Sequence, residues 1–242
     1  GGPTFNNLED AITRDYSIRR ENLADGGVAP DADILAVVAP HRLDPPSVFA
    51  IDQFLMRGGT VIIVTSPYTT ELADGELRLQ DWDSGLVEWL AFQGITLGES
   101  LVLDKQSSAF PAPIIRESGG YKFRDVKILD YPYFIDLRSD GLTHAHPITG
   151  SLPQLTMAWA SPIAVQPQPG RRITTLLTSS AQSWLSTSMD IMPTTAGEEP
   201  SEADQYGPRK LGVMLQGRFN SFFSERPDPG GEEGRANTNP GA

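Results

Sequence analysis

Two short apolar runs with a helix-like stretch between them give the clearest pattern in the chain. Residues 33–39 are almost continuously apolar, which is typical of a strand covered on both faces. Residues 47–57 carry apolar side chains at three- and four-residue spacing, the period of a helix, and Gly58-Gly59 suits its end. Residues 60–65 repeat the buried-strand pattern. A crossover of this length predicts a parallel, right-handed β-α-β unit.

The rest of the first hundred residues extends this α/β pattern. Residues 8–13 predict a helix, and residues 16–20 predict the entry of a strand. A second helix is expected to begin at Asp83 and to end at Gly94, and residues 100–104 form another short apolar run. This half therefore predicts an open, mostly parallel sheet flanked by helices.

The second half is patterned differently. Short strand-like runs are separated by proline and glycine and predict antiparallel or mixed strands; they cover residues 121–129, 155–159, 163–166, 173–178 and 211–215. We expect residues 1–110 to form the parallel core, and residues 111–224 to form a mixed-sheet extension of it or a small second subdomain. Residues 193–210 predict an acidic loop, and residues 225–242 a disordered tail or linker.

Composition removes several classes of function. With 19 Lys and Arg against 31 Asp and Glu, the net charge is −12, which disfavours binding to nucleic acid or to anionic lipid. The absence of cysteine excludes disulfides and thiolate chemistry. No apolar run approaches the roughly 20 residues of a membrane-spanning helix, and no signal segment opens the chain, which we interpret as a fragment of a longer protein.

The serine, histidine and glycine residues of the chain do not form a recognisable catalytic or cofactor motif. Ser66 lacks the glycine-flanked context of a hydrolase nucleophile, so a hydrolase is only a remote alternative. Gly58-Gly59 follows a helix, whereas a phosphate-binding loop follows a strand. His144 and His146 could in principle hold a metal, but Pro147 favours a turn in which the imidazoles bond backbone groups. We therefore expect no cofactor, no metal and no enzymatic activity.

Four polar residues lie where an open α/β sheet would bind a ligand. His41, Ser66 and Tyr68, and Asp104 each follow a predicted parallel strand, and ligands of such sheets bind outside the carboxyl ends of the strands. A cleft lined by these four side chains would make the chain a receptor for a small molecule or a glycan. This is the alternative to a role in protein–protein interaction.

An aromatic cluster and three carboxylates allow two interpretations each. Tyr131, Tyr133 and Phe134 surround a proline, where aromatic side chains often stay exposed, so they are a candidate partner surface; core packing is the alternative. Asp31, Asp33 and Asp52 could form a carboxylate pair. A solvated charge or a local hydrogen bond explains them better.

Several stretches together resemble the auxiliary domain of uncharacterised ABC transport systems, whose best-known class is the gliding-motility protein GldG. The resemblance is carried first by residues 31–40 and 51–59. Four further stretches follow in the order of that family: residues 90–104, 146–152, 176–184 and 211–223. Each stretch is a weak signal alone, and the ordered set is more specific.

The resemblance implies an α/β fold related to the glutamine-amidotransferase-like and intraflagellar-transport-subunit folds. It also implies an extracytoplasmic position, tethered by membrane segments outside these residues, and partners among the membrane and ATPase subunits of a transporter or another auxiliary protein. It defines no catalytic residues, and the cysteine of the amidotransferases is absent here. The family begins with an additional strand, for which only residues 1–5 remain. We therefore expect a non-catalytic accessory domain that binds proteins or presents a ligand.

Overall fold

The computed structural model describes residues 5–73, 76–118, 121–193, 200, 205–227 and 229, with the backbone alone at residues 113–118, 122 and 124. It divides the chain into two compact units. The first unit takes the described parts of Gly1–Thr65, Asp83–Gln93 and Gln216–Ala242, and the second takes those of Ser66–Trp82 and Gly94–Leu215. Most of the predicted acidic loop and tail lies outside the described residues.

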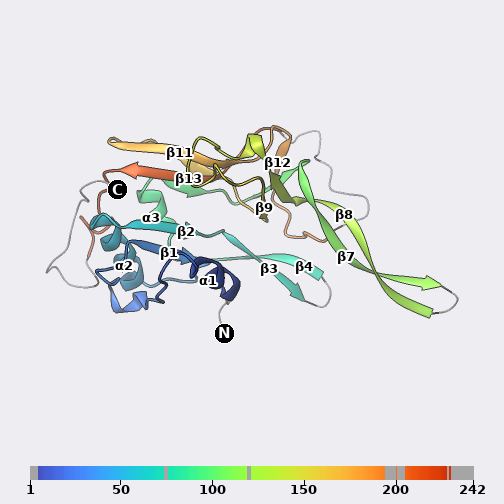
Figure 1. Ribbon diagram of the computed structural model, residues 1–242, viewed down its shortest axis with the longest axis horizontal. Helices are drawn as coiled ribbons and strands as arrows, with labels where there is room; N and C mark the ends of the chain where they lie inside the picture. Colours follow the sequence, from blue (N-terminus) through green and yellow to red (C-terminus); the bar gives the residue numbers. More distant parts are fainter. Residues whose placement is uncertain are drawn as a thin grey trace. The chain divides into compact units, whose positions relative to one another are not determined.

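The first unit contains the predicted β-α-β arrangement (Figure 1). Strands β1 (Ile34–Val38) and β2 (Thr60–Val64) pair in parallel, and α2 (Pro45–Met56) connects them. Helix α2 begins at Asp44, whose carboxylate accepts a hydrogen bond from the Ser47 amide at 3.0 Å. Helices α1 (Asn6–Ile12) and α3 (Val87–Phe92) lie at the two other predicted helices, although α3 begins at Val87 and not at Asp83. The β-α-β prediction is therefore confirmed.

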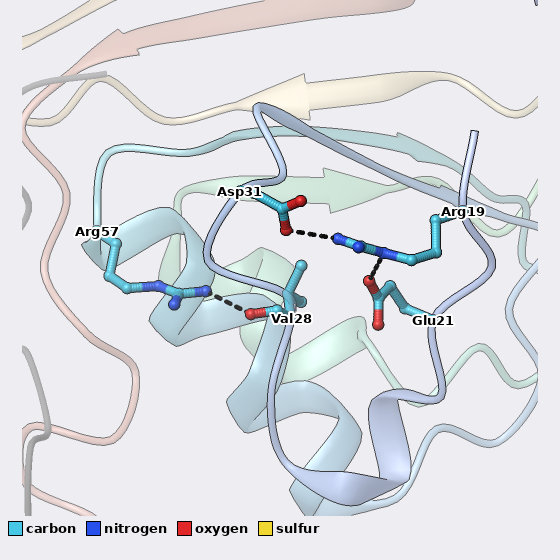
Figure 2. Close-up of polar contacts among 5 residues, drawn as sticks. All are labelled: Arg19, Glu21, Val28, Asp31 and Arg57. Carbon is cyan, nitrogen blue, oxygen red and sulfur yellow. Dashed lines mark hydrogen bonds and ion pairs between the residues drawn. The ribbon is translucent and has the colours of Figure 1, made fainter. Parts of the chain in front are cut away.

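The segment between α1 and β1 holds a short 3-10 helix, η1 (Leu23–Asp25), and no strand is described at residues 16–20, where the sequence predicts a strand entry. Polar side chains fasten this segment instead (Figure 2). The Arg19 guanidinium donates to the carboxylates of Glu21 and Asp31, each at 2.7 Å. Its hydrogen bond to Asp31 lowers the pKa of the Asp31 carboxyl. Arg57, just after α2, donates to the carbonyl oxygen of Val28 at 3.0 Å.

One face of the β1–β2 pair is open, which corrects the expectation that these strands are covered on both faces. Leu35 and Val37 are buried, whereas Ile34 is 49% exposed on the other side of the strand. On β2, Ile62 and Val64 are 47% and 56% exposed. Alternate residues of a strand point to opposite faces, so these three side chains share one face. We call Ile34, Ile62 and Val64 the open face.

The second unit is built from small sheets. Strands β3 (Tyr68–Ala73) and β4 (Glu76–Asp81) form an antiparallel hairpin, and β5 (Ile95–Leu97) pairs antiparallel with β10 (Ile163–Val165). Strands β11 (Arg171–Thr178) and β13 (Lys210–Gly217) are neighbours. The strands predicted in the second half are present, whereas β3, β4, β5 and β12 (Ser183–Ser186) were not predicted.

Strand β6 (Leu101–Asp104) is the centre of the core of this unit. All four of its residues are buried, which agrees with its continuous apolar pattern. Leu101 and Leu103 pack in a cluster with Tyr131, Tyr133 and Trp184, while Val102 packs in a second cluster with Ile135 and Leu137. However, β6 pairs antiparallel with β12, not with a parallel neighbour.

The longest hairpin in Figure 1 joins β7 (Ser107–Ser118) to β8 (Tyr121–Leu137). The base of β8 also pairs with β9 (Leu155–Ala158), so the three strands form one antiparallel sheet in which β8 is central. A 3-10 turn, η2 (Ser139–Gly141), follows β8. The sequence predicts the first half of β8 but not β7.

The chain is thus α/β in composition, with many strands and few helices, but the predicted open and mostly parallel sheet is replaced by small sheets. Apart from the parallel pair β1–β2, the pairs named above with a defined register are antiparallel. The two units interleave along the chain. The division at residue 110 stays a prediction.

Candidate functional site

The loop between β1 and α2 has a constrained backbone. Ala39 and Arg42 adopt positive φ angles of 45° and 48°, which are uncommon for residues with a side chain and often mark functional sites. The loop is held by two backbone bonds to the segment that precedes α3: the Arg42 amide donates to the Asp83 carbonyl at 2.8 Å, and the Leu43 amide donates to that of Ser84 at 3.2 Å.

Gly85 allows this close approach of two backbones. It has a φ of 75°, and a Cβ atom at this position would lie 2.5 Å from both the nitrogen and the oxygen of Leu43. Any side chain here would push the two segments apart. The loop that follows the first parallel strand is therefore positioned by a glycine 42 residues beyond Leu43 in the sequence.

A hollow of about 330 Å³ lies beside this loop within the first unit. Its wall comes from the loop and the start of α2, from the segment leading into α3, and from the chain after β13; the lining residues are Leu43, Pro45, Val48, Asp83, Gly85, Val87, Glu88, Trp89, Phe222 and Phe223. Most of these side chains are apolar, and the exposed carboxylates of Asp83 and Glu88 give the rim a negative charge. Such a surface suits an apolar group that carries a positive charge or N–H donors.

A buried carboxylate fixes the two phenylalanines of this wall. Asp52, on α2, accepts hydrogen bonds from the Trp89 indole N–H at 3.0 Å and from the Phe222 amide at 2.9 Å, both at Oδ1. Its Oδ2 accepts from the Ser221 hydroxyl at 2.6 Å. Asp52 is fully buried, so the expectation of a solvated charge is wrong for this residue. The Gln53 side-chain amide, which donates to Oδ2 at 3.2 Å, is a local partner, whereas the three other donors come from distant parts of the chain.

The four residues of the predicted cleft are divided between the two units. His41 lies in the exposed loop of the first unit, and the other three belong to the second. Ser66 and Tyr68 are held together, because the Ser66 hydroxyl oxygen accepts a hydrogen bond from the Tyr68 amide at 3.2 Å. Burial, together with the nearby Asp81 and Glu99, raises the pKa of the Tyr68 hydroxyl. The shared cleft stays a prediction.

Asp104 has a different setting from the one that a ligand cleft requires. Its side chain is fully buried, and it accepts hydrogen bonds from the amide and the hydroxyl of Ser180, both at 2.6 Å, and from the Gln106 amide at 2.9 Å. These bonds join the end of β6 to the turn between β11 and β12. These hydrogen bonds account for the buried Asp104 carboxylate without a ligand.

The aromatic cluster at residues 131–134 belongs to the core, which corrects the expectation of exposure. Tyr131 and Tyr133 are 1% and 0% exposed, and Phe134 is partly buried against Phe110 and Trp159. The Tyr131 hydroxyl donates to the Ile191 carbonyl at 2.6 Å, which satisfies its polar atom inside the core. A contact with a partner through this cluster stays a prediction, and Phe134 is its most accessible member.

The histidine pair forms the predicted turn. The Ile148 amide donates to His146 Nδ1 at 3.3 Å, and His144 Nδ1 lies 3.5 Å from the Gly150 carbonyl oxygen. Within the part of the chain that the structure describes, no group of three or more His, Asp or Glu side chains is arranged to hold a metal ion. In the same residues, no helix has the length and apolar character needed to cross a membrane.

Comparison with known proteins identifies the family. A family model described as an ABC-type uncharacterized transport system matches residues 3–241. Neither the curated proteins nor the solved structures contain a match. The match confirms the resemblance to auxiliary transport components, while the link to GldG stays a prediction. Because the model covers nearly all of the 242 residues, the chain belongs to the family of ABC-type uncharacterized transport systems as an auxiliary component.

Proposed function

We propose that this chain is a non-catalytic, extracytoplasmic accessory domain that binds another subunit of its ABC transport system. The observation that carries the proposal is the open face, where Ile34, Ile62 and Val64 are each about half exposed on adjacent strands. Apolar side chains gathered on one surface of a soluble unit are typical of protein contacts. The family match supports a partner within an ABC transport system. For an extracytoplasmic domain, we propose that this partner is a membrane subunit or a second auxiliary protein.

The absence of cysteine allows a direct test in the native protein within its own cells. The variant Ile62→Cys places one thiol of this chain on the open face. We expect a membrane-impermeant maleimide to label this thiol severalfold more slowly when the other subunits of the transport system are present than in cells that lack them, because a bound subunit covers the face.

Ile148→Cys is the matched control, since Ile148 is similarly exposed but lies in the turn after His146. Its labelling is expected to be equally fast in both strains. Equal rates at Ile62→Cys in the two strains would remove the open face as the contact surface. Labelling of both variants by a permeant reagent alone would show that the extracytoplasmic position is wrong.

A second candidate function, small-molecule binding, is favoured by the hollow in the first unit. We expect a ligand with an apolar body and a cationic end to bind there, next to Asp83 and Glu88. At 100 times its dissociation constant, such a ligand adds about 2.7 kcal/mol of stability, a shift of several degrees in Tm. The measurement is a thermal-shift screen with such amines. A shift that persists in Glu88→Lys would place the ligand elsewhere, and a screen without shifts would favour protein binding.

A further inference from the structure

The two edges of the β7–β8 hairpin differ in their ability to pair with another strand. Pro111 and Pro113 lie on β7, opposite Ile128 and Val126. Proline lacks an amide N–H, so it is tolerated where that group would point away from the neighbouring strand. The outer edge of β7 is therefore blocked at two positions.

The same register turns the polar backbone groups of Val126 and Ile128 outward. In an antiparallel pair, residues opposite each other either exchange hydrogen bonds or both face away, in alternation. Pro111 and Pro113 occupy positions that do not exchange hydrogen bonds with the opposite strand. The backbone N–H and C=O groups of Val126 and Ile128, which lie opposite them, therefore point to the outer edge of β8. The Val126 amide agrees with this direction, since it donates to the neighbouring Asp125 carboxylate at 2.9 Å.

The open part of this edge has a defined length. At the base of β8, strand β9 pairs from Phe134 onward, and the Trp159 amide donates to the Tyr133 carbonyl at 3.0 Å. Pro132, which has no amide N–H, directly precedes this paired part of the strand. Within the described residues, no strand other than β7 pairs with β8 from Tyr121 to Tyr131, so the outer edge of this stretch is open. The centre of this open stretch is Val126.

Large apolar side chains are exposed along the same stretch. Tyr121, Phe123, Val126 and Ile128 are each more than half exposed, on both faces of the hairpin. Exposure of this kind on a strand with an unpaired edge favours association and is normally avoided in monomeric proteins. It indicates that the edge is covered in the functional state.

The charges on β8 indicate that a second copy of the same strand covers its open edge. If two copies pair antiparallel about Val126, Asp125 of each copy lies opposite Lys127 of the other, on one face of the sheet. Phe123 then lies opposite Leu129. Moving the two-fold axis by one residue in either direction opposes Asp125 with Asp125, or Lys127 with Lys127. The charge pattern and the open length therefore identify the same centre.

We propose that this protein forms a two-fold symmetric dimer through the outer edges of its β8 strands, with Val126 on the axis. The pairing joins two hairpins into a four-stranded antiparallel sheet over residues 121–131. The Val126 amide exchanges its bond to the Asp125 carboxylate for a bond across the interface. Two Asp125–Lys127 ion pairs fix the register, and the exposed apolar side chains gain cross-strand neighbours.

Charge reversal tests this pairing in the purified full chain. Asp125→Lys places Lys against Lys, and Lys127→Asp places Asp against Asp, so each variant alone is expected to raise the dimer Kd by at least about tenfold. The double variant restores opposite charges and is expected to return Kd close to that of the wild type. An equimolar mixture of the two single variants is expected to form a mixed dimer. Sedimentation equilibrium at low ionic strength measures each case.

Arg172→Asp reverses an exposed charge on β11 and is the matched control, with no change of Kd expected. Val126→Pro removes an outward amide without removing a bond to β7, so it is expected to give monomers with an intact hairpin. A wild-type chain that stays monomeric at submillimolar concentration would overturn the proposal. The proposal would also be wrong if the double reversal raised Kd as much as each single reversal does. If the wild-type chain were monomeric and bound another protein through the outer edge of β8, that protein, and not a second copy, would be the occupant.

Discussion

Asp52→Ala is expected to lower the stability of the first unit by about 3–5 kcal/mol, the largest effect of a single substitution that the structure predicts. The fully buried carboxylate joins three separate segments: α2, through its own backbone, α3, through Trp89, and the chain after β13, through Ser221 and Phe222. Its removal leaves the Trp89 indole N–H and the Phe222 amide without an acceptor and opens a cavity between them.

Asp52→Asn separates the loss of hydrogen bonds from the loss of volume. The amide keeps the shape of the carboxylate but presents an NH2 group at one of the two oxygen positions. At Oδ1 this group would face two N–H donors, the Trp89 indole and the Phe222 amide. At Oδ2 it would face the Ser221 hydroxyl, which can turn to accept, and the more distant Gln53 side-chain amide. We therefore expect the amide to take the second orientation and to cost less than alanine, about 1–2 kcal/mol.

Hydrogen exchange measured by mass spectrometry is the appropriate readout, because the chain has two compact units and global unfolding need not be two-state. Faster exchange is expected in peptides from α2, α3 and residues 216–227 of Asp52→Ala. Asp33→Ala, which removes an exposed carboxylate from the same unit, is the control and should leave these peptides unchanged. Unchanged exchange in Asp52→Ala would show that the three segments are held together without this carboxylate.

The sequence predicts local elements well where one pattern determines them. The β-α-β unit follows from two apolar runs and a helical repeat between them, and Asp44 and the proline at the start of α2 determine where the helix begins. The turn at His144 and His146 is equally local. Residues 73 and 76 are paired in the β3–β4 hairpin, and the sequence Asp74-Gly75 between them was an available signal that the prediction did not use.

Strand partners are harder to predict, because a buried apolar strand has the same pattern in a parallel and in an antiparallel sheet. Residues 33–39 and 100–104 have similar patterns, yet β1 has an open face, and β6 lies between two apolar clusters. The difference arises from distant segments. Tyr131 and Tyr133 cover β6 from residues about 30 positions away, and proline between them gave a misleading indication of exposure.

The hollow in the first unit was missed for the same reason. Its loop was predicted to lie near a ligand site through His41, but its shape depends on Gly85 and on Phe222, which no short-range motif connects to the loop. The long separation between Asp52 and Ser221 likewise leaves no periodic signal. Aspartate within a helix that is otherwise rich in buried residues was the available indication of a buried acceptor.

Asp104→Ala is expected to destabilise the second unit by about 3 kcal/mol, because three hydrogen bonds end on this buried carboxylate. Removal of the carboxylate takes away the acceptor of the Ser180 and Gln106 amides and of the Ser180 hydroxyl in a buried position. Hydrogen exchange is therefore expected to accelerate in β6 and β12, which pair side by side.

The same substitution distinguishes the structural role of Asp104 from its predicted role in a ligand cleft. If the Asp104 carboxylate served only to bind a ligand, Asp104→Asn would weaken ligand binding but leave the hydrogen exchange of β6 and β12 unchanged. The structure predicts the opposite for Asp104→Asn. Its NH2 group at the Oδ1 position would face the Gln106 amide, a donor, although the Ser180 hydroxyl can turn to accept from it. We expect an intermediate loss of about 1–2 kcal/mol, since one of the three bonds is replaced by a contact between two donors.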